Sequence, residues 1–132
     1  MKLFVDSAAH LALLCEEDRH HGAAVGLLRR IPSSELVTSR FILSEVLARG
    51  ARLQGATETV EYVRGILSRP SYTVLPMLPE ILDAAMDGLV KYEDQGLSFV
   101  DCTSIVVMRS SRIRTIFTFD RAFRKLGFVV VP

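Results

Sequence analysis

The chain has 132 residues, of which 49% are hydrophobic and 23% charged, a composition that excludes a disordered chain and is typical of a folded globular protein. A chain of this length can bury roughly two-thirds of its unfolded surface, and we expect one domain over residues 1–132. Its formal net charge of +1 excludes the overall basic field of many nucleic-acid-binding proteins, so such binding would depend on local patches or on a metal ion.

The N-terminal apolar stretch does not indicate export. It is interrupted by Asp6 and His10, and no small-residue cleavage site follows it. No segment reaches the roughly 18 apolar residues that a membrane span requires. The cysteines, Cys15 and Cys102, lie in apolar helical patterns without CxxC spacing, which favours reduced core thiols over a disulfide or zinc site. We therefore expect a cytoplasmic protein that does not contact a membrane.

Strands and helices alternate along the predicted chain. In its first half we predict a strand at 2–5, helices at 7–16 and from 23 to just before Pro32, a strand at 36–38, and helices at 39–53 and 57–68. In its second half we predict a strand at 72–75, helices at 79–92 and 99–109, a strand at 115–119, a helix at 121–126 and a strand at 128–131. This alternation predicts an α/β fold with a parallel sheet covered on both faces.

Helical spacing also predicts which apolar side chains point inward. The expected core positions of the second, third and fourth helices are Ala23, Ala24, Leu27, Leu28, Phe41, Ile42, Val46, Leu47, Val60, Val63 and Leu67. The last three could instead line a groove for an amphipathic partner helix or a dimer surface, and the sequence leaves these alternatives open.

Four acidic residues are predicted to meet at one edge of the sheet. Asp6 and Asp120 follow the first and fourth strands, and ligands of such folds bind at the carboxyl ends of strands. Asp101 lies in the first turn of the crossover helix that leads to the fourth strand, so it starts at the same edge. Glu45 is within about two turns, or roughly 9 Å, of the start of its helix. All four carboxylates can therefore converge.

Two of these acids stand among apolar residues. Glu45 shares a helix face with Phe41 and Ile42, and Asp101 is flanked by Val100 and Cys102. An unpaired carboxylate in such surroundings costs several kcal/mol or takes up a proton. Hard oxygen ligands without clustered cysteine or histidine favour Mg²⁺ or Mn²⁺ over zinc.

Each acid also has a simpler interpretation. The two acids that follow strands can be helix caps, and Asp101 can complement a helix dipole. Glu45 can pair with an arginine such as Arg40 or Arg49. The placement of all four on one edge favours a metal site. Other chemistry fits less well: a haloacid-dehalogenase-like phosphatase needs a second acid where Ala8 stands.

Five segments, in this order and spacing, resemble the PIN-domain family, and specifically the VapC-like toxins of bacterial and archaeal toxin–antitoxin pairs. They are VDSAAHLALL, DRHHGAA, TSRFILSEVLAR, LSFVDCTSIVVM and IFTFDRAFRKLGF, and the similarity covers nearly the whole chain. The resemblance implies a single PIN-like domain with five parallel strands in the order 3-2-1-4-5 and helices on both faces.

The resemblance also implies roles for particular residues. The family's acidic quartet corresponds to Asp6, Glu45, Asp101 and Asp120, its small hydroxyl residue after the first acid to Ser7, and the hydroxyl two before the last acid to Thr118. Thr118 is expected to orient Asp120 or a metal-bound water. His10 departs from the apolar or aromatic residue usual in the first helix, and His20 or His21 fits a DxxHxxA pattern that we interpret as structural.

The implied activity is that of a Mg²⁺- or Mn²⁺-dependent endoribonuclease, a toxin that cleaves RNA by a metal-activated water, is neutralised by a cognate antitoxin and forms a homodimer. Residues 109–125 hold six basic residues against the single acid Asp120, and Arg112, Arg121 and Arg124 are candidate RNA contacts. A solvated basic face or an antitoxin-contacting surface is the alternative for this cluster. The alternative for the whole chain is a non-catalytic PIN-like module that binds RNA or protein.

Overall fold

A computed structural model describes residues 1–31 and 35–132 of the chain. Its strands are β1 (Lys2–Val5), β2 (Glu35–Ser39), β3 (Tyr72–Leu75), β4 (Thr115–Phe117) and β5 (Val129–Val131). Its helices are α1 (Ser7–Leu14), α2 (His21–Arg30), α3 (Arg40–Leu53), α4 (Ala56–Ser68), α5 (Pro79–Lys91), α6 (Phe99–Ser110) and α7 (Ala122–Lys125), with a 3₁₀ turn at Glu93–Gln95. No helix in these described ranges is long and apolar enough to cross a membrane.

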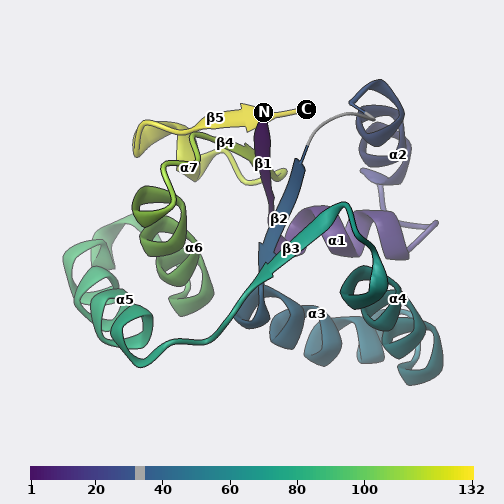
Figure 1. Ribbon diagram of the computed structural model, residues 1–132, viewed down its shortest axis with the longest axis horizontal. Helices are drawn as coiled ribbons and strands as arrows, with labels where there is room; N and C mark the ends of the chain where they lie inside the picture. Colours follow the sequence, from purple (N-terminus) through teal and green to yellow (C-terminus); the bar gives the residue numbers. More distant parts are fainter. Residues whose placement is uncertain (32–34) are drawn as a thin grey trace.

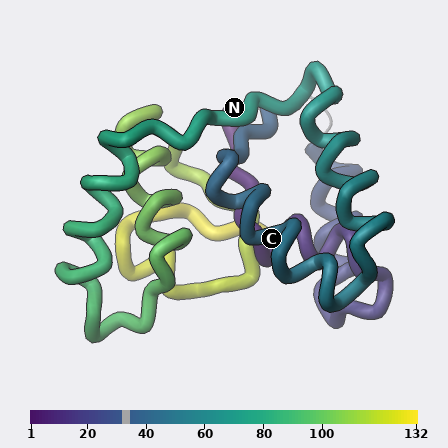
Figure 2. The backbone as a smooth tube through the Cα atoms, turned by 90° about the horizontal axis from the view of Figure 1, so that it is seen from below, coloured from purple at the N-terminus to yellow at the C-terminus, as the bar shows by residue number. Residues whose placement is uncertain are grey.

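The strands form one parallel sheet in the order β3-β2-β1-β4-β5, which confirms the predicted α/β fold and strand order. Because parallel crossovers are right-handed, the reversal of direction after β3 places α5, α6 and α7 on the opposite face from α1 to α4. Figure 1 shows this division, and Figure 2 shows the α5–α6 pair and the α3–α4 pair on opposite sides of the sheet.

The central strands are buried on both sides, as expected where helices cover both faces of a sheet. Leu3, Phe4 and Val5 of β1 are fully buried, as are Ile116 and Phe117 of the neighbouring β4. The backbone amide of Asp6 donates to the carbonyl of Phe117 at 3.0 Å, so the ladder between these strands continues to the edge where the acids lie. The position of Asp6 is therefore fixed by the best-packed part of the sheet.

Several predicted boundaries and core positions are wrong by a small margin. Helix α1 ends at Leu14 and β4 ends at Phe117, each two residues early; after β4 the chain turns, and the Thr118 hydroxyl accepts from the Asp120 amide at 3.2 Å. Leu47 and Leu67 are 37% and 45% exposed, and Ala23 is exposed too, since each lies at the margin of the buried face of its helix. Pro32, expected to stop the second helix, lies outside the described residues.

His10 is fully buried in a chain of neutral hydrogen bonds, which explains its place among apolar neighbours. The Thr38 hydroxyl donates to the carbonyl of Val5 at 3.0 Å, so its oxygen accepts from His10 Nε2 at 3.2 Å. The remaining ring nitrogen, Nδ1, then accepts from the Tyr62 hydroxyl at 2.8 Å. Burial lowers the pKa of His10 to about 3, so the ring stays neutral and joins β2, α1 and α4.

Candidate active site

The four predicted acids are positioned by elements that end or begin at the carboxyl edge of the sheet. Asp6 follows β1, and Asp120 comes three residues after the end of β4. Glu45 lies on α3, which begins directly after β2, and Asp101 is in the first turn of α6. The Ser39 hydroxyl accepts from the Ile42 amide at 3.2 Å and so fixes the start of the helix that carries Glu45.

Asp6 is the most deeply buried of the four, with 3% of its side chain exposed. Its Oδ2 accepts a hydrogen bond from the Thr118 hydroxyl at 2.7 Å, whereas Oδ1 is buried and has no hydrogen-bond partner within the described part of the chain. A buried carboxylate oxygen without a partner is costly unless it is protonated or binds a cation. This orphaned oxygen is the observation that a metal ion would explain.

Burial is also the main reason that the pKa of Asp6 rises from 3.8 to about 7. The nearby carboxylates of Asp101 and Glu45 raise it further, while the Thr118 hydroxyl and the Ser7 backbone amide act in the opposite direction. Asp6 has no side-chain capping bond to α1, so its interpretation as a helix cap is wrong. Its environment penalises the negative charge that a bound cation would neutralise.

Asp101 shares this electrostatic environment. Burial raises its pKa, and the carboxylates of Asp120 and Glu45 raise it further, whereas hydrogen bonds with Ser98 lower it. Taken together, these mutual effects connect all four acids: Asp6 with Asp101 and Glu45, and Asp101 with Asp120 and Glu45. The structure therefore brings the quartet within electrostatic range at one edge.

The acids are not already arranged as a finished metal site. Within residues 1–31 and 35–132, no group of three or more histidine, cysteine, aspartate or glutamate side chains is arranged to hold an ion. Two of the acids accept hydrogen bonds from backbone amides: Asp101 Oδ2 from the Ser98 amide at 2.9 Å, and Asp120 Oδ1 from the Ala122 amide at 2.9 Å. The interpretation of Asp120 as a cap is therefore correct for one of its oxygens, and Asp101, interpreted from the sequence as complementing a helix dipole, forms a capping box with Ser98.

A cavity of about 330 Å³ beside the acids supplies positive charge. It is lined by Thr118, which contacts Asp6, and by Arg19, Arg121 and Arg124. Figure 1 shows the connection between β4 and α7 next to β5, and residues of both segments line the cavity. Two of the predicted RNA contacts, Arg121 and Arg124, thus lie next to the acidic edge.

His20 and Phe119 line the same cavity and were not predicted as site residues. Their rings stack with centroids 4.2 Å apart and planes 6° from parallel. The Nε of Arg19 donates to Nε2 of His20 at 3.2 Å. The sequence signal was present, because Phe119 directly precedes Asp120, but only the packing of the α1–α2 loop against β4 shows that the histidine lies there.

Other predicted residues lie away from the acids. Arg112 lines a separate cavity at the opposite edge of the sheet. The Nδ1 of His21 donates to the carbonyl of Ala12 at 2.7 Å, which agrees with a structural role. Cys15 and Cys102 are buried free thiols, as predicted.

Val60, Val63 and Leu67, for which the sequence left a groove, core positions and a dimer surface as alternatives, differ in their burial. Val63 is buried in the core, Val60 is partly buried and Leu67 is 45% exposed. A cavity of about 320 Å³ beside α4 is lined instead by Glu61, Tyr62, Gly65, Ile66 and Arg69.

The chain is similar in sequence and structure to known proteins. A family model described as PIN domain matches residues 3–129. The chain is 32% identical over 129 residues to a Mycobacterium tuberculosis protein named 23S rRNA-specific endonuclease VapC20, covering 98% of this chain and 97% of that protein. The crystal structure of M. tuberculosis VapC20, described as a sarcin-ricin loop cleaving toxin, matches with a TM-score of 0.90 and 31% identity over 98% of this chain and 99% of that one. VapBC2 from Rickettsia felis, crystallised with a promoter DNA fragment, shares the fold with a TM-score of 0.72 and 12% identity over 98% and 97% of the two chains.

Proposed function

This chain belongs to the PIN domain family and is a VapC-like endoribonuclease, and from that premise we propose that Asp6, Glu45, Asp101 and Asp120 hold the divalent metal ion that RNA cleavage requires. Nucleases of this family generally use a divalent metal, and the all-oxygen donor set favours Mg²⁺ or Mn²⁺. The single observation that carries the proposal is the buried, unpartnered Oδ1 of Asp6 beside three further carboxylates.

Three of the four acids have an oxygen available for an ion. Asp6 offers Oδ1, while the hydroxyl of Thr118 fixes its other oxygen. Asp101 and Asp120 each use one oxygen for a backbone amide, so each is already restrained in its rotamer. Glu45 is partly buried on α3 and serves either as a direct ligand or through a water molecule. When bound, the ion supplies Lewis-acid activation of a water molecule and stabilises negative charge on the phosphodiester.

Thr118 acts as a positioning residue and Ser7 supports the same acid. The Thr118 hydroxyl donates to Asp6 and its oxygen accepts from the Asp120 amide at 3.2 Å, so one side chain sets the relative positions of two acids. Ser7 is buried at the start of α1, with its backbone amide directed to Asp6. The family resemblance implies that Thr118 orients Asp120 or a metal-bound water, and its contact with Asp120 runs through the backbone amide of that residue.

The basic cavity beside the acids is proposed to hold the RNA. Arg19, Arg121 and Arg124 can neutralise phosphates next to the scissile bond, since guanidinium groups bind phosphate in a bidentate fashion. The stacked pair of His20 and Phe119 offers a flat surface on which an unpaired base can stack. Because the relative named for 23S rRNA is 32% identical over almost the whole chain, we propose ribosomal RNA as the substrate class and the cytoplasm as the place of action.

A toxin of this kind requires a neutralising partner. We propose a cognate antitoxin and a homodimer, and α5 provides surface for such contacts: Leu82, Met86 and Leu89 are 40% to 47% exposed, and Val90 is 75% exposed. This face, and not the predicted positions on α4, is the larger apolar helix surface within the described residues.

Replacement of Asp101 by asparagine tests the proposed activity. Asp101→Asn keeps an oxygen that can accept from the Ser98 amide and so preserves the capping box, but it removes the charge needed for metal binding. We expect loss of most Mg²⁺-dependent cleavage of ribosomal RNA, with an unchanged circular dichroism spectrum and with EDTA abolishing wild-type cleavage. Asp83→Asn, at an exposed position on α5, serves as the matched control. Wild-type cleavage by Asp101→Asn would refute the assignment.

A further inference from the structure

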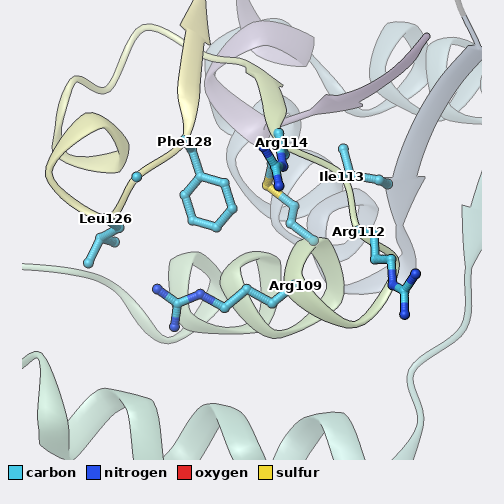
Figure 3. Close-up of a pocket in the computed structure, with 8 residues that line it drawn as sticks. Arg109, Arg112, Ile113, Arg114, Leu126 and Phe128 are labelled. Atoms are coloured by element: carbon cyan, nitrogen blue, oxygen red, sulfur yellow. The ribbon is translucent and has the colours of Figure 1, made fainter.

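A second basic cavity lies at the opposite edge of the sheet from the acids. Its volume is about 570 Å³, within the range of ligand-binding pockets. It is formed by the C-terminal end of α6, the residues that lead into β4 and the turn before β5. Figure 3 shows Arg109 and Arg114 on the α6 and β4 sides of the hollow, with Phe128 and Leu126 across from them and Arg112 at the far rim.

The cavity has the chemistry of an anion site with an apolar floor. Arg109, Arg112 and Arg114 line it, and within the described residues no acidic side chain does. Arg109 is held in place, because its Nη1 donates to the Tyr92 hydroxyl at 3.2 Å and its guanidinium carbon lies 5.8 Å from the centre of the Phe128 ring. A pre-oriented guanidinium loses less conformational freedom when it binds phosphate.

Helix capping explains only part of this cluster. A basic residue in the last turn interacts favourably with the helix dipole, and Arg109 already fills that role for α6. Arg112 lies beyond the helix, and Arg114 lies at the entry to β4. The two further arginines therefore concentrate positive charge beyond what the helix end requires.

The backbone conformation of Arg112 also indicates that its side chain has a role. Its φ is 56°, in the left-handed region, where it closes α6 by a turn in which the Ile113 amide donates to the Met108 carbonyl at 2.8 Å. Glycine is the usual residue at this position, because a Cβ is sterically disfavoured there. Glycine would close the helix with less strain. Backbone geometry therefore does not explain why this position holds an arginine, and we attribute the choice to its charged side chain.

The second cavity lies at the other end of β4 from the basic cavity beside the acids. Arg114 precedes β4 and Thr118 follows it, a separation of four residues or roughly 13 Å along a strand. The two basic cavities thus lie at the two ends of the edge strand β5, and α7 runs between them with exposed Arg124 and Lys125. The basic surface continues from the acidic edge to the second cavity.

We propose that this second cavity binds a phosphate group of the RNA backbone a few nucleotides from the scissile bond. The proposal rests on the proposed ribonuclease function and specifies its substrate: an RNA long enough to extend along α7, held at two points. Arginine without acidic neighbours favours phosphate, and continuity with the first cavity favours the substrate over a protein partner.

The test combines a double variant with substrates of two lengths. Arg112→Gly/Arg114→Gln removes two of the charges and relieves the left-handed backbone, while Arg64→Gln on the exposed surface of α4 is the matched control. The substrates are a stem–loop RNA that extends well beyond the scissile bond on both sides and a short oligonucleotide that spans only the bond and its neighbours. Urea unfolding is measured alongside, and we expect the double variant to unfold at the same or a higher urea concentration than the wild type.

We expect the double variant to cleave the stem–loop with a KM about 10-fold higher and an unchanged kcat, and to cleave the short oligonucleotide like the wild type. Binding of the stem–loop in EDTA, followed by fluorescence anisotropy, should show a salt slope smaller by about 0.7 to 0.9, the value for one lost phosphate contact. Because this binding assay needs no cleavage, it reports on the cavity even if the wild type cuts neither RNA, an outcome that would refute the proposed function alone.

Three results would overturn the proposal. The first is wild-type affinity and salt dependence of the double variant for the stem–loop. The second is an equal loss on long and short substrates, which would indicate damage to the acidic edge. The third is normal RNA binding with reduced inhibition by the cognate antitoxin, which would assign the cavity to a protein partner.

Discussion

Replacement of Asp6 by asparagine should stabilise the metal-free protein while abolishing its activity. Burial raises the pKa of Asp6 from 3.8 to about 7, so its ionised form is disfavoured in the folded state. At 1.36 kcal/mol per pH unit, this difference amounts to roughly 4 kcal/mol of lost stability above pH 7. Asparagine is uncharged, can still accept from Thr118 and avoids this cost.

The sign of the pH dependence follows from the raised pKa. Between pH 3.8 and about 7 the folded state binds more protons at Asp6 than the unfolded state does, so this residue makes stability fall as pH rises. The advantage of Asp6→Asn should therefore be largest at pH 8 and should vanish near pH 4. Urea unfolding in EDTA at both pH values measures it.

Mg²⁺ provides the second part of this experiment. Saturating metal should raise the free energy of unfolding of the wild type, by about 2.7 kcal/mol at 100 times Kd, and should leave Asp6→Asn nearly unchanged. Asp83→Asn, an exposed control, should differ from the wild type by no more than about 0.5 kcal/mol under all conditions. If Asp6→Asn were no more stable than the wild type in EDTA at pH 8, the claim of a strained carboxylate would be wrong.

Four further predictions concern the same site and its surroundings. Apparent Mn²⁺ affinity, measured by calorimetry, should rise with pH up to about 7 and then level off, because the ion must displace the proton of Asp6; a flat profile would contradict this. Thr118→Val should reduce cleavage at least 10-fold with little loss of fold, since it removes the hydroxyl that positions Asp6, and wild-type rates would exclude that role. Buried His10, whose pKa is lowered to about 3, takes up a proton only on unfolding. In the Asp6→Asn variant, the free energy of unfolding should therefore rise with pH between about 4.5 and 6.5, by at most about 1.4 kcal/mol per pH unit. Adding His10→Gln should flatten this slope in urea titrations. Arg124→Gln should weaken RNA binding and lower its salt slope by about 0.7 to 0.9, whereas Arg64→Gln should do neither.

The sequence predicted the fold because each element is marked by local patterns. The fully apolar strand at Leu3–Val5 and the alternation of strands with helices specify a buried parallel sheet, and the family resemblance supplied the strand order that the structure confirms. Placement of Asp6 and Asp101 at the carboxyl edge followed from topology alone, since each directly follows a strand or begins a crossover helix.

What the sequence could not supply depends on tertiary packing. The arginines of residues 109–125 look like one cluster along the chain, but β4 runs between Arg112 and the pair Arg121 and Arg124 and places them at opposite edges of the sheet. Similarly, His20 reaches Phe119 across almost a hundred positions of sequence, a contact that no local pattern encodes. The electrostatic state of the acids is equally non-local, because Asp101 on α6 and Glu45 on α3 raise the pKa of Asp6, which follows β1.

Anomalous X-ray diffraction from crystals soaked in Mn²⁺ tests the central claim most directly. We expect a Mn²⁺ peak within about 2.0 to 2.6 Å of the free oxygen of Asp6 and of oxygens from Asp101 and Asp120, and no such peak in crystals of Asp6→Asn. Mn²⁺ bound elsewhere, with Oδ1 of Asp6 still buried and uncoordinated at saturating metal, would contradict the account.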